Sequence, residues 1–398
     1  MAPSTPIQRR LPKEIWALGF VSLLMDVSSE MIHSLLPMFM VTTLGASVLA
    51  VGFIEGAAES TALIVKVFSG VLSDYIGKRK GLAVFGYGLG ACTKPLFAIA
   101  TSSGMVLAAR LTDRIGKGIR GAPRDALVAD LVEPELRGAA YGLRQSLDTV
   151  GAFLGPLLAV VLMFAWSNNF RAIFWVAVIP AMLSVLLLLL GIHEPDRKDP
   201  GKRINPISRA NLRRLSADYW WVVGLGAVFT LARFSEAFLV LRAQQLGIPM
   251  AWVPLVMMAM SVVYSLSAYP LGKLSDTMSH SKLLVYGMIT LIIADGILAA
   301  ADRWPLLFCG VLLWGLHMGM TQGLLATMVS DTAPADLRGT AFGFFNLVSG
   351  LAMLLASAAA GFLWDQWGAP STFLGGAVFC VLGLVAMKWR AIVQSDRL

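Results

Sequence analysis

A run of ionisable residues lies within a stretch of the chain that is otherwise apolar. The stretch reads ARLTDRIGKGIRGAPRDALVAD, and its charged residues up to position 125 are Arg110, Asp113, Arg114, Lys117, Arg120, Arg124 and Asp125. At about 100° per residue on a helix, all seven fall within a sector of roughly 140°, so one face is ionic and the other is apolar. Ionisable residues in a membrane-spanning helix normally face a bundle interior or a water-filled cavity. The stripe therefore indicates a path for a substrate or an ion.

Two carboxylates lie near mid-depth of the first apolar stretch, at Asp26 and Glu30. They share one helix face with His33, because steps of three and four residues return to nearly the same direction. A carboxylate in surroundings of low dielectric constant takes up and releases a proton as those surroundings change. Asp26 and Glu30 are therefore predicted to couple proton movement to transport. The alternative is that they only neutralise arginines of the stripe.

Further charged residues from both halves of the chain are expected to line a substrate cavity. In the first half these are His33, Arg110, Asp113, Arg114, Lys117 and Asp148, and in the second half they are Arg233, Glu236 and His317. A lone histidine such as His317 is also a common hydrogen-bonded interior residue. The stripe itself carries five cations against two acids, a balance that would attract an anionic or zwitterionic cargo.

The composition is that of a chain lying mostly in lipid. Of 398 residues, 57% are apolar and 14% are charged, and the mean hydropathy is +0.72, which excludes a water-soluble domain of this length. The apolar stretches lack the alternation of polar and apolar residues that is typical of barrel strands, so they predict an all-α membrane protein. Twelve of them are long enough for a hydrocarbon core of about 30 Å, at 14–40, 48–69, 81–101, 104–127, 140–165, 171–193, 219–243, 251–271, 282–301, 304–328, 341–364 and 371–390.

Basic residues predict the orientation of the chain. They cluster before the first stretch, after the second at 78–80, and in the loop after the sixth at 197–214, whereas the opposite loops hold almost none. By the positive-inside rule, both termini are cytoplasmic, and the protein is expected to be a multi-pass protein of the inner (cytoplasmic) membrane. The N-terminal segment is read as leading into a first membrane helix rather than a signal peptide. The formal net charge of +8 follows from this topology, so no nucleic-acid partner is expected.

The two halves of the chain resemble each other. GVLSDYIGKRK at 70–80 corresponds to GKLSDTMSHSK at 272–282, and LRGAAYG at 136–142 corresponds to LRGTAFG at 337–343. The duplication predicts an N-terminal six-helix bundle at 1–193, a cytoplasmic linker loop at 194–218 and a C-terminal six-helix bundle at 219–398. Two related bundles imply a pseudo-twofold axis along the membrane normal and a binding site between them near the midplane.

The loop after the second stretch resembles a signature of the major facilitator superfamily. The matching residues are Gly70, Leu72, Asp74, Gly77 and the basic cluster 78–80. The resemblance covers essentially the whole chain and implies the major facilitator fold, with twelve transmembrane helices in two pseudo-symmetric six-helix bundles. It also implies a gating role, because an acid that pairs with different groups in two rocking states acts as a latch. The expected gating set is Gly70, Asp74, Gly77, Lys78, Arg79, Asp130 and Asp276.

A second resemblance concerns the fifth stretch. The spacing of Gly142, Gly151, Gly155 and Pro156 is similar to the fifth-helix signature of the drug/proton antiporter branch of this superfamily, whose closing glycine pair is replaced here by Ala159 and Val160. Small residues allow close approach of helices, and a proline bends a helix. The resemblance implies export in exchange for protons, whereas close helix packing alone is the structural alternative. Arg110 and Arg114 both qualify as the arginine that assists coupling.

The leading interpretation is a secondary active transporter that exports small amphiphilic compounds by proton-coupled antiport and alternating access. The alternative is a carrier of an anionic metabolite or a metal chelate. A copper carrier is disfavoured although methionines cluster at 257–260 and 318–320, since no ligand set at helical spacing accompanies them. A membrane-embedded enzyme is disfavoured because no phosphate-binding loop is present. The expected partners are a small-molecule substrate, protons and the lipid bilayer. Neither a cofactor nor a metal is expected, and the chain is expected to act as a monomer.

Overall fold

The computed structural model describes residues 11–76, 79–133, 136–193, 213–275, 277–334 and 337–395. The regular structure of these residues is helical throughout. The long helices are α1 (Lys13–His33), α3 (Val48–Ile76), α4 (Arg79–Ile99), α5 (Ser103–Leu131), α6 (Arg137–Ala165), α7 (Phe170–Gly191), α9 (Ala217–Ala232), α11 (Leu255–Ser275), α12 (His280–Ala300), α13 (Trp304–Thr332), α14 (Arg338–Trp367) and α15 (Ala369–Ser395). Short elements are α2 (Leu36–Met38), the π-helical turn η1 (Phe39–Thr43), α10 (Ala237–Gln245) and the 3₁₀ turn η3 (Met250–Trp252).

Eleven segments of the described chain are long and apolar enough to cross a membrane. The 29-residue helix α5 is not among them, because its charged face lowers its hydropathy. It packs between α3 and α4, which shield that face from lipid. With α5 included, the described chain has twelve spans, which confirms the predicted all-α membrane architecture.

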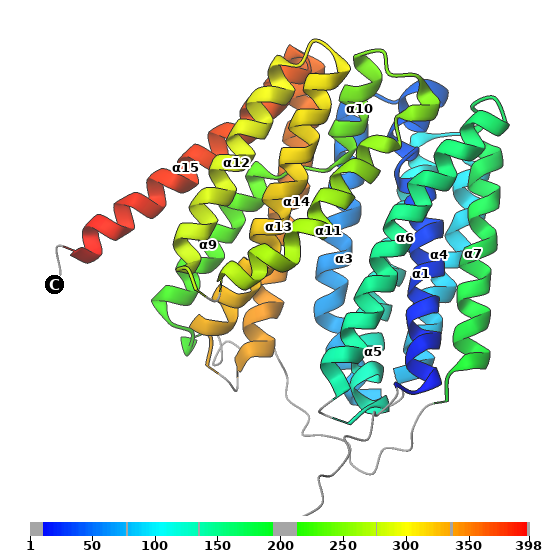
Figure 1. The fold of residues 1–398 in the computed structure, drawn as a ribbon, viewed down its shortest axis with the longest axis horizontal. Coiled ribbons are helices and arrows are strands. Elements are labelled where there is room, and N and C mark those ends of the chain that lie inside the picture. The colour runs from blue at the N-terminus through cyan, green and yellow to red at the C-terminus, as the bar shows by residue number, and fades with distance from the viewer. Residues whose placement is uncertain are drawn as a thin grey trace, which may run out of the picture.

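The spans form two bundles that stand side by side (Figure 1). In the first bundle, α1 packs against α6 and α7, and α5 packs against α3 and α4. In the second bundle, α13 packs against α11 and α12, and α15 packs against α12, α14 and α9. The bundles meet where α3 packs along α14 and where α6 contacts α11. Residues far apart in the sequence therefore face each other across one interface.

Polar side chains cap the N-termini of several helices. The side chains of Ser102, Asn169 and Ser216 each accept a hydrogen bond from the backbone N–H three residues later, at 3.3, 3.1 and 3.1 Å. The first amides of a helix have no partner within it, so a capping oxygen satisfies a group that would otherwise be left open. These caps fix the starts of α5, α7 and α9, and therefore the registers of their side chains.

The seventh span is interrupted. α9 ends at Ala232 and α10 begins at Ala237, and the segment Arg233–Glu236 between them is not helical. The backbone N–H of Arg233 closes the last turn on the carbonyls of Phe229 and Thr230. Non-helical backbone at membrane depth is tolerated only where it is buried in protein or lines a cavity, because lipid offers no hydrogen bonds. The break therefore marks a place where the second bundle faces such an environment.

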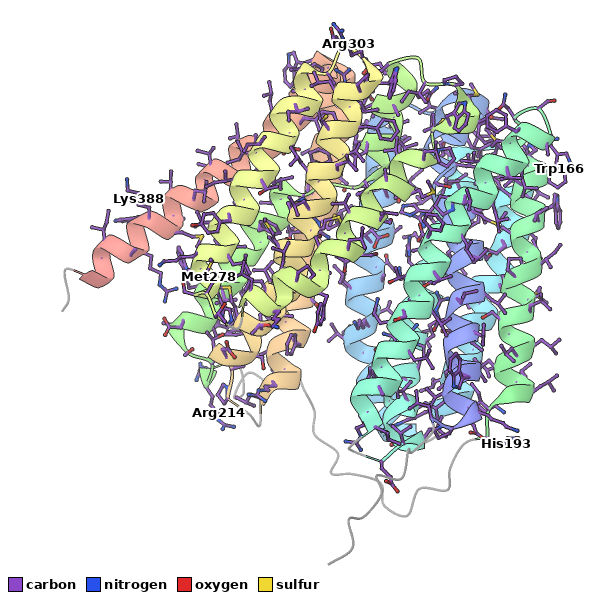
Figure 2. The ribbon with its side chains drawn as sticks, viewed as in Figure 1. Trp166, His193, Arg214, Met278, Arg303 and Lys388 are labelled. Atoms are coloured by element: carbon purple, nitrogen blue, oxygen red, sulfur yellow. The ribbon has the colours of Figure 1, made fainter. Side chains whose placement is uncertain are left out.

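The two ends of the bundles are distinguished by where the linker attaches. Figure 2 places His193 and Arg214, which flank the segment between the bundles, at one end, and Trp166 and Arg303 at the opposite end. We call these the linker end and the far end. The helices of the two bundles approach each other at the far end and diverge toward the linker end (Figure 1).

The apolar cores show the same asymmetry. One large core joins both bundles and contains Phe39 of the first and Phe238 of the second. A second core belongs to the first bundle alone and reaches Ile192 beside the linker. A third belongs to the second bundle alone and includes Leu215. The bundles thus share buried surface toward the far end and bury separate cores toward the linker end.

A carboxylate closes the far end of the interface. Asp365, near the end of α14, accepts hydrogen bonds from the backbone N–H groups of Val48 (3.2 Å) and Leu49 (2.9 Å) at the start of α3. A negative charge at a helix N-terminus is favourable because it meets free N–H groups and the positive end of the helix dipole. Close approach depends on Gly361, where an added Cβ would lie 2.7 Å from the Cα of Leu49. Asp365 therefore holds one bundle to the other at this end.

Candidate functional site

A cavity of about 600 Å³ lies between the bundles. It is lined by α1, α3, α5 and α6 of the first bundle, and by the break between α9 and α10, α11, α13 and α14 of the second. The residues predicted for coupling and cargo binding that line it are Asp26, Glu30, His33, Arg114, Lys117, Asp148, Arg233 and Glu236. The cavity therefore gathers most of the charged residues singled out in the sequence.

Two acids of α3 pair with two arginines of α5. Arg110 makes a bidentate contact with Glu55, in which its Nε lies 3.1 Å from Oε1, and Nη2 of Arg114 lies 2.9 Å from Oε1 of Glu59. Both pairs repeat after four residues on each helix, so the two helices match their charges one turn apart. The side chain of Glu55 is fully buried, whereas that of Glu59 is one-third exposed. We call these two ion pairs the ladder, and it extends from the protein interior to the cavity.

His33 bridges the ladder to α1. Its Nδ1 lies 3.5 Å from Glu30 and its Nε2 lies 3.5 Å from Glu55. An imidazole donates from both nitrogens only when it is protonated. The bridge between these two carboxylates is therefore complete when His33 carries a proton, and Glu30 is held by His33 rather than by an arginine of the stripe.

Asp26 is an acid of the cavity without a salt-bridge partner in the described part of the chain. The charges acting on it come from Glu30 on its own helix, Lys117 and Arg120 on α5, and Asp148 on α6. The sequence left open whether Asp26 and Glu30 only neutralise arginines of the stripe. In the structure Arg110 and Arg114 take their partners from α3, which leaves Asp26 available to cavity water.

Toward the linker end, a second group of charges joins α5 to α6. Arg144 contacts Asp148 at 2.6 Å and Asp125 at 3.8 Å, and Arg124 contacts Asp125 at 3.1 Å. The guanidinium of Arg120 lies 4.6 Å from the centroid of the Tyr87 ring. Such a cation–π contact stabilises a cation without cancelling its charge.

Four cations line the cavity without an ion pair among the described residues: Lys66, Lys117, Arg120 and Arg233. Lys117 on α5 is exposed to the cavity, and Arg233 lies at the start of the α9–α10 break. Glu236, at the end of the same break, is likewise without an ion pair there. These groups are free to interact with the charged part of a cargo.

Three residues expected in the cavity lie outside its lining. Arg110 is turned toward Glu55, and Asp113 is turned toward Lys94 at 2.9 Å, so both are buried between helices of the first bundle. His317 is fully buried beside the rings of Phe229 and Trp314. This corrects the placement expected from the sequence. Helical periodicity defines the face that a residue occupies, but it does not define which neighbouring helix covers that face.

The second bundle gives the cavity its apolar wall. Phe234 and Tyr264 line it, together with Met257, Met260, Met318 and Met353. Methionine is flexible and polarisable, so it adapts to ligands of varied shape. The cavity therefore has an ionic wall on one bundle and a thioether and aromatic wall on the other.

The structure describes only part of the expected gating set. Arg79, at the start of α4, contacts Asp130 of α5 at 2.5 Å and donates to the carbonyl of Ala126 at 2.6 Å. Gly70 and Asp74 lie within α3, but their side-chain surroundings are outside the described structure. Gly77, Lys78 and Asp276 also lie outside the described residues. Their gating role stays a prediction.

Two glycines of α6 allow this helix to pack closely against the acids of α1. A Cβ added at Gly151 would lie 2.9 Å from the Cβ of Asp26, and one added at Gly155 would lie 2.6 Å from the Cβ of Glu30. Gly142 has no atom near its added Cβ, and α6 continues through Pro156 as one helix. Part of the glycine spacing singled out in the sequence thus positions the candidate coupling acids.

We expect Gly155→Ala to impair transport, because the added methyl group would push α1 and Glu30 away from α6. Overpacking of this kind costs about 1–3 kcal/mol when the backbone must shift. Transport rates and thermal unfolding of the purified protein would be compared with Gly142→Ala, whose added methyl group enters open space. Equal activity of the two variants would show that the α1–α6 contact does not constrain Glu30.

Glu55, Glu59 and Lys94 pair with charged residues of α5, although the expected set of site residues did not include them. A signal was available, since Glu55 and Glu59 repeat the four-residue spacing of Arg110 and Arg114 on another span. Lys94 carried no comparable signal. Its Nζ donates to Asp113 and to the hydroxyl of Ser29 (3.1 Å), contacts that depend on how α4 is rotated against its neighbours.

Comparison with known proteins gives one consistent family. Residues 18–253 and 234–397 match the family described as Major Facilitator Superfamily. A protein of Methanocaldococcus jannaschii described as an uncharacterized MFS-type transporter is 33% identical over 391 residues, which cover 94% of this chain and 94% of that protein. The multidrug resistance protein MdtH of Aeromonas hydrophila is 27% identical over 354 residues, or 87% of this chain and 85% of that protein.

The fold also matches solved structures. The crystal structure of the nucleoside transporter NupG is similar with a TM-score of 0.73, covering 94% of this chain and 97% of that chain. The sequence identity is 14%, so this likeness concerns the fold alone.

Proposed function

Because the chain belongs to the Major Facilitator Superfamily, we propose that this secondary transporter exports small amphiphilic compounds in exchange for protons by alternating access. The observation that carries the proposal is the state of Asp26. This carboxylate lines the cavity without an ion pair among the described residues, while Arg110 and Arg114 are paired with acids of α3. An unpaired acid in a water-filled cavity within the membrane is suited to bind a proton when the cargo is absent.

The two walls of the cavity support an amphiphilic cargo. A charged or polar group of the cargo would face Lys117 and Asp26 of the first bundle. Its apolar part would pack against Met257, Met260 and Tyr264 of the second bundle. Similarity to a protein named for multidrug resistance supports export of such compounds.

We also propose that the linker end is cytoplasmic. Arg214 lies at that end (Figure 2), and Lys80 donates to the carbonyl of Leu189, near His193. Both belong to the basic clusters of the sequence at 78–80 and 197–214, and basic loops remain on the cytoplasmic side. The protein would then be a monomer of the inner membrane with both termini in the cytoplasm. The structure would show a state open to the cytoplasm, with Asp365 holding the outer side closed.

Alternating access requires two units that rock against each other. We propose the bundles at 1–193 and 219–398 as these units, joined by the linker at 194–218. Asp74, near the end of α3, together with the pair Arg79 and Asp130, would form a cytoplasmic latch that is remade in the opposite state.

An anionic metabolite or a metal chelate is the second candidate cargo. Lys117 and Arg233 favour it, because both are cations of the cavity without an ion pair in the described chain. Export of amphiphiles accounts for these cations and for the methionine wall together, so it is the leading proposal.

Purified protein in liposomes would decide between the two. We expect addition of lipophilic cations and zwitterions to move protons in the opposite direction, read by a trapped pH indicator. Proton movement with small anions alone would favour the second cargo class. Cargo movement without any proton movement would overturn antiport.

A further inference from the structure

A second buried acid lies in the other bundle. Asp295 on α12 is completely buried, and neither of its carboxylate oxygens has a hydrogen-bond partner. It belongs to no ion pair of the described residues and does not line the cavity. A buried carboxylate with no partner is rare, because both its charge and its polar atoms lose the stabilisation that water provides.

The carboxylate faces the broken span. A Cβ added at Gly376 on α15 would lie 2.8 Å from Oδ2 of Asp295 and 2.8 Å from the carbonyl oxygen of Ala232. Ala232 is the last residue of α9, so its carbonyl lies at the negative end of the helix dipole. Both oxygens therefore border the space that a side chain at Gly376 would fill.

The groups around Asp295 offer it no positive charge. α12 packs against α13 and α15. On α15 the titratable neighbour is Cys380, whose side chain is buried. The titratable residues of α13 are Cys309, which is exposed, His317, which contacts Phe229 and Trp314, and Asp331, which contacts His280. Arg233, at the start of the break, lines the cavity. An ionised Asp295 would therefore meet a carbonyl dipole of the same sign and no cation.

We propose that Asp295 is a second proton-binding site, which holds a proton in this conformation beside the Ala232 carbonyl. A protonated carboxyl group needs only one acceptor oxygen, and the Ala232 carbonyl borders the same space beside Gly376. A sodium ion needs several oxygen ligands, whereas the other groups described beside Gly376 and Asp295 are the Phe234 ring and the Cys380 side chain, which supply no oxygen.

This site would connect proton binding to the cavity through the break. The Ala232 carbonyl precedes the segment Arg233–Glu236, whose two charged ends line the cavity. Loss of the proton would place a negative charge against the end of α9 and favour a different arrangement of the break. This role rests on the proposed proton coupling, whereas proton binding by Asp295 does not.

Infrared difference spectroscopy of the purified full-length protein tests the binding. At neutral pH we expect a carbonyl stretching band of a protonated carboxylic acid that is lost in Asp295→Asn and exchanges slowly in D₂O, because the group is buried. Asp302→Asn, in an exposed loop next to the same helix, should leave the band unchanged. A spectrum identical in wild type and Asp295→Asn would overturn the proposal. Binding of radioactive sodium that Asp295→Asn abolishes would overturn it in favour of a sodium site.

A second variant covers the case in which Asp295→Asn does not fold. Gly376→Ala keeps the carboxyl group but pushes a methyl group between it and Ala232, so the band should shift in frequency. Gly296→Ala, next to Asp295 in a position with open space, should leave it in place. A band unmoved by Gly376→Ala would assign it to another acid and contradict the proposal. Both readouts are independent of transport, so the site could exist in a transporter that does not exchange protons.

Discussion

Asp26→Asn and Glu30→Gln are expected to abolish proton-driven accumulation while cargo counterflow continues. Both variants remove a carboxylate that faces the cavity and keep its size and hydrogen-bonding shape. A pH difference of one unit supports about tenfold accumulation per coupled proton, since it corresponds to 1.36 kcal/mol. In proteoliposomes with such a gradient, the ratio of cargo concentrations across the membrane should reach about 10 for the wild type and about 1 for each variant.

The comparison with counterflow separates coupling from cargo binding. Counterflow needs cargo binding and reorientation but no net proton movement. If either variant loses counterflow to the same degree as accumulation, its acid binds cargo rather than protons. Asp302→Asn, which removes a carboxylate that is 64% exposed and far from the cavity, serves as the control and should retain both activities.

Glu55→Gln is expected to destabilise the protein strongly, because it leaves Arg110 buried with an uncompensated charge. Both side chains of the pair are almost completely buried. Removing one partner of a buried ion pair typically costs about 3–5 kcal/mol, whereas an exposed pair such as Arg303 and Asp302 contributes about 0–1 kcal/mol. Thermal unfolding of the protein in detergent should show a large decrease in the unfolding temperature for Glu55→Gln and little change in it for Asp302→Asn.

A double variant makes this test specific. Replacing both partners, as in Glu55→Gln with Arg110→Met, removes the stranded charge and should recover much of the lost stability. If the double variant is no more stable than Glu55→Gln alone, the loss does not arise from the uncompensated arginine. Equal unfolding temperatures for Glu55→Gln and wild type would show that the pair is not buried in the membrane-embedded protein.

The spans and the coupling face could be predicted because they depend on local properties. Hydropathy defines the length of each span, and the spacing of Asp26, Glu30 and His33 defines their shared face. Both features are present in the structure. Partners across helices could not be predicted in the same way. Whether Arg110 faces the cavity or Glu55 depends on how α5 rotates against α3, and that rotation is decided by packing over the whole bundle.

Two other features were hidden for identifiable reasons. The expected span at 219–243 gave no sign of the break, because the segment Arg233–Glu236 contains neither glycine nor proline. The methionines at 257–260 and 318–320 were considered only as copper ligands, yet Met257, Met260 and Met318 line the cavity. In both cases the second bundle, and not the local sequence, decides the environment.

Accessibility of a single cysteine tests alternating access most directly. Ser261 on α11 lines the cavity, and Ser261→Cys is a conservative change. In a background with Cys92, Cys309 and Cys380 replaced, a membrane-impermeant thiol reagent would be applied from each side of oriented vesicles. We expect modification from the linker end at rest, and from the far end as well during turnover. A cysteine that reacts from one side only under all conditions, or from neither, would contradict a cavity that opens alternately to the two faces of the membrane.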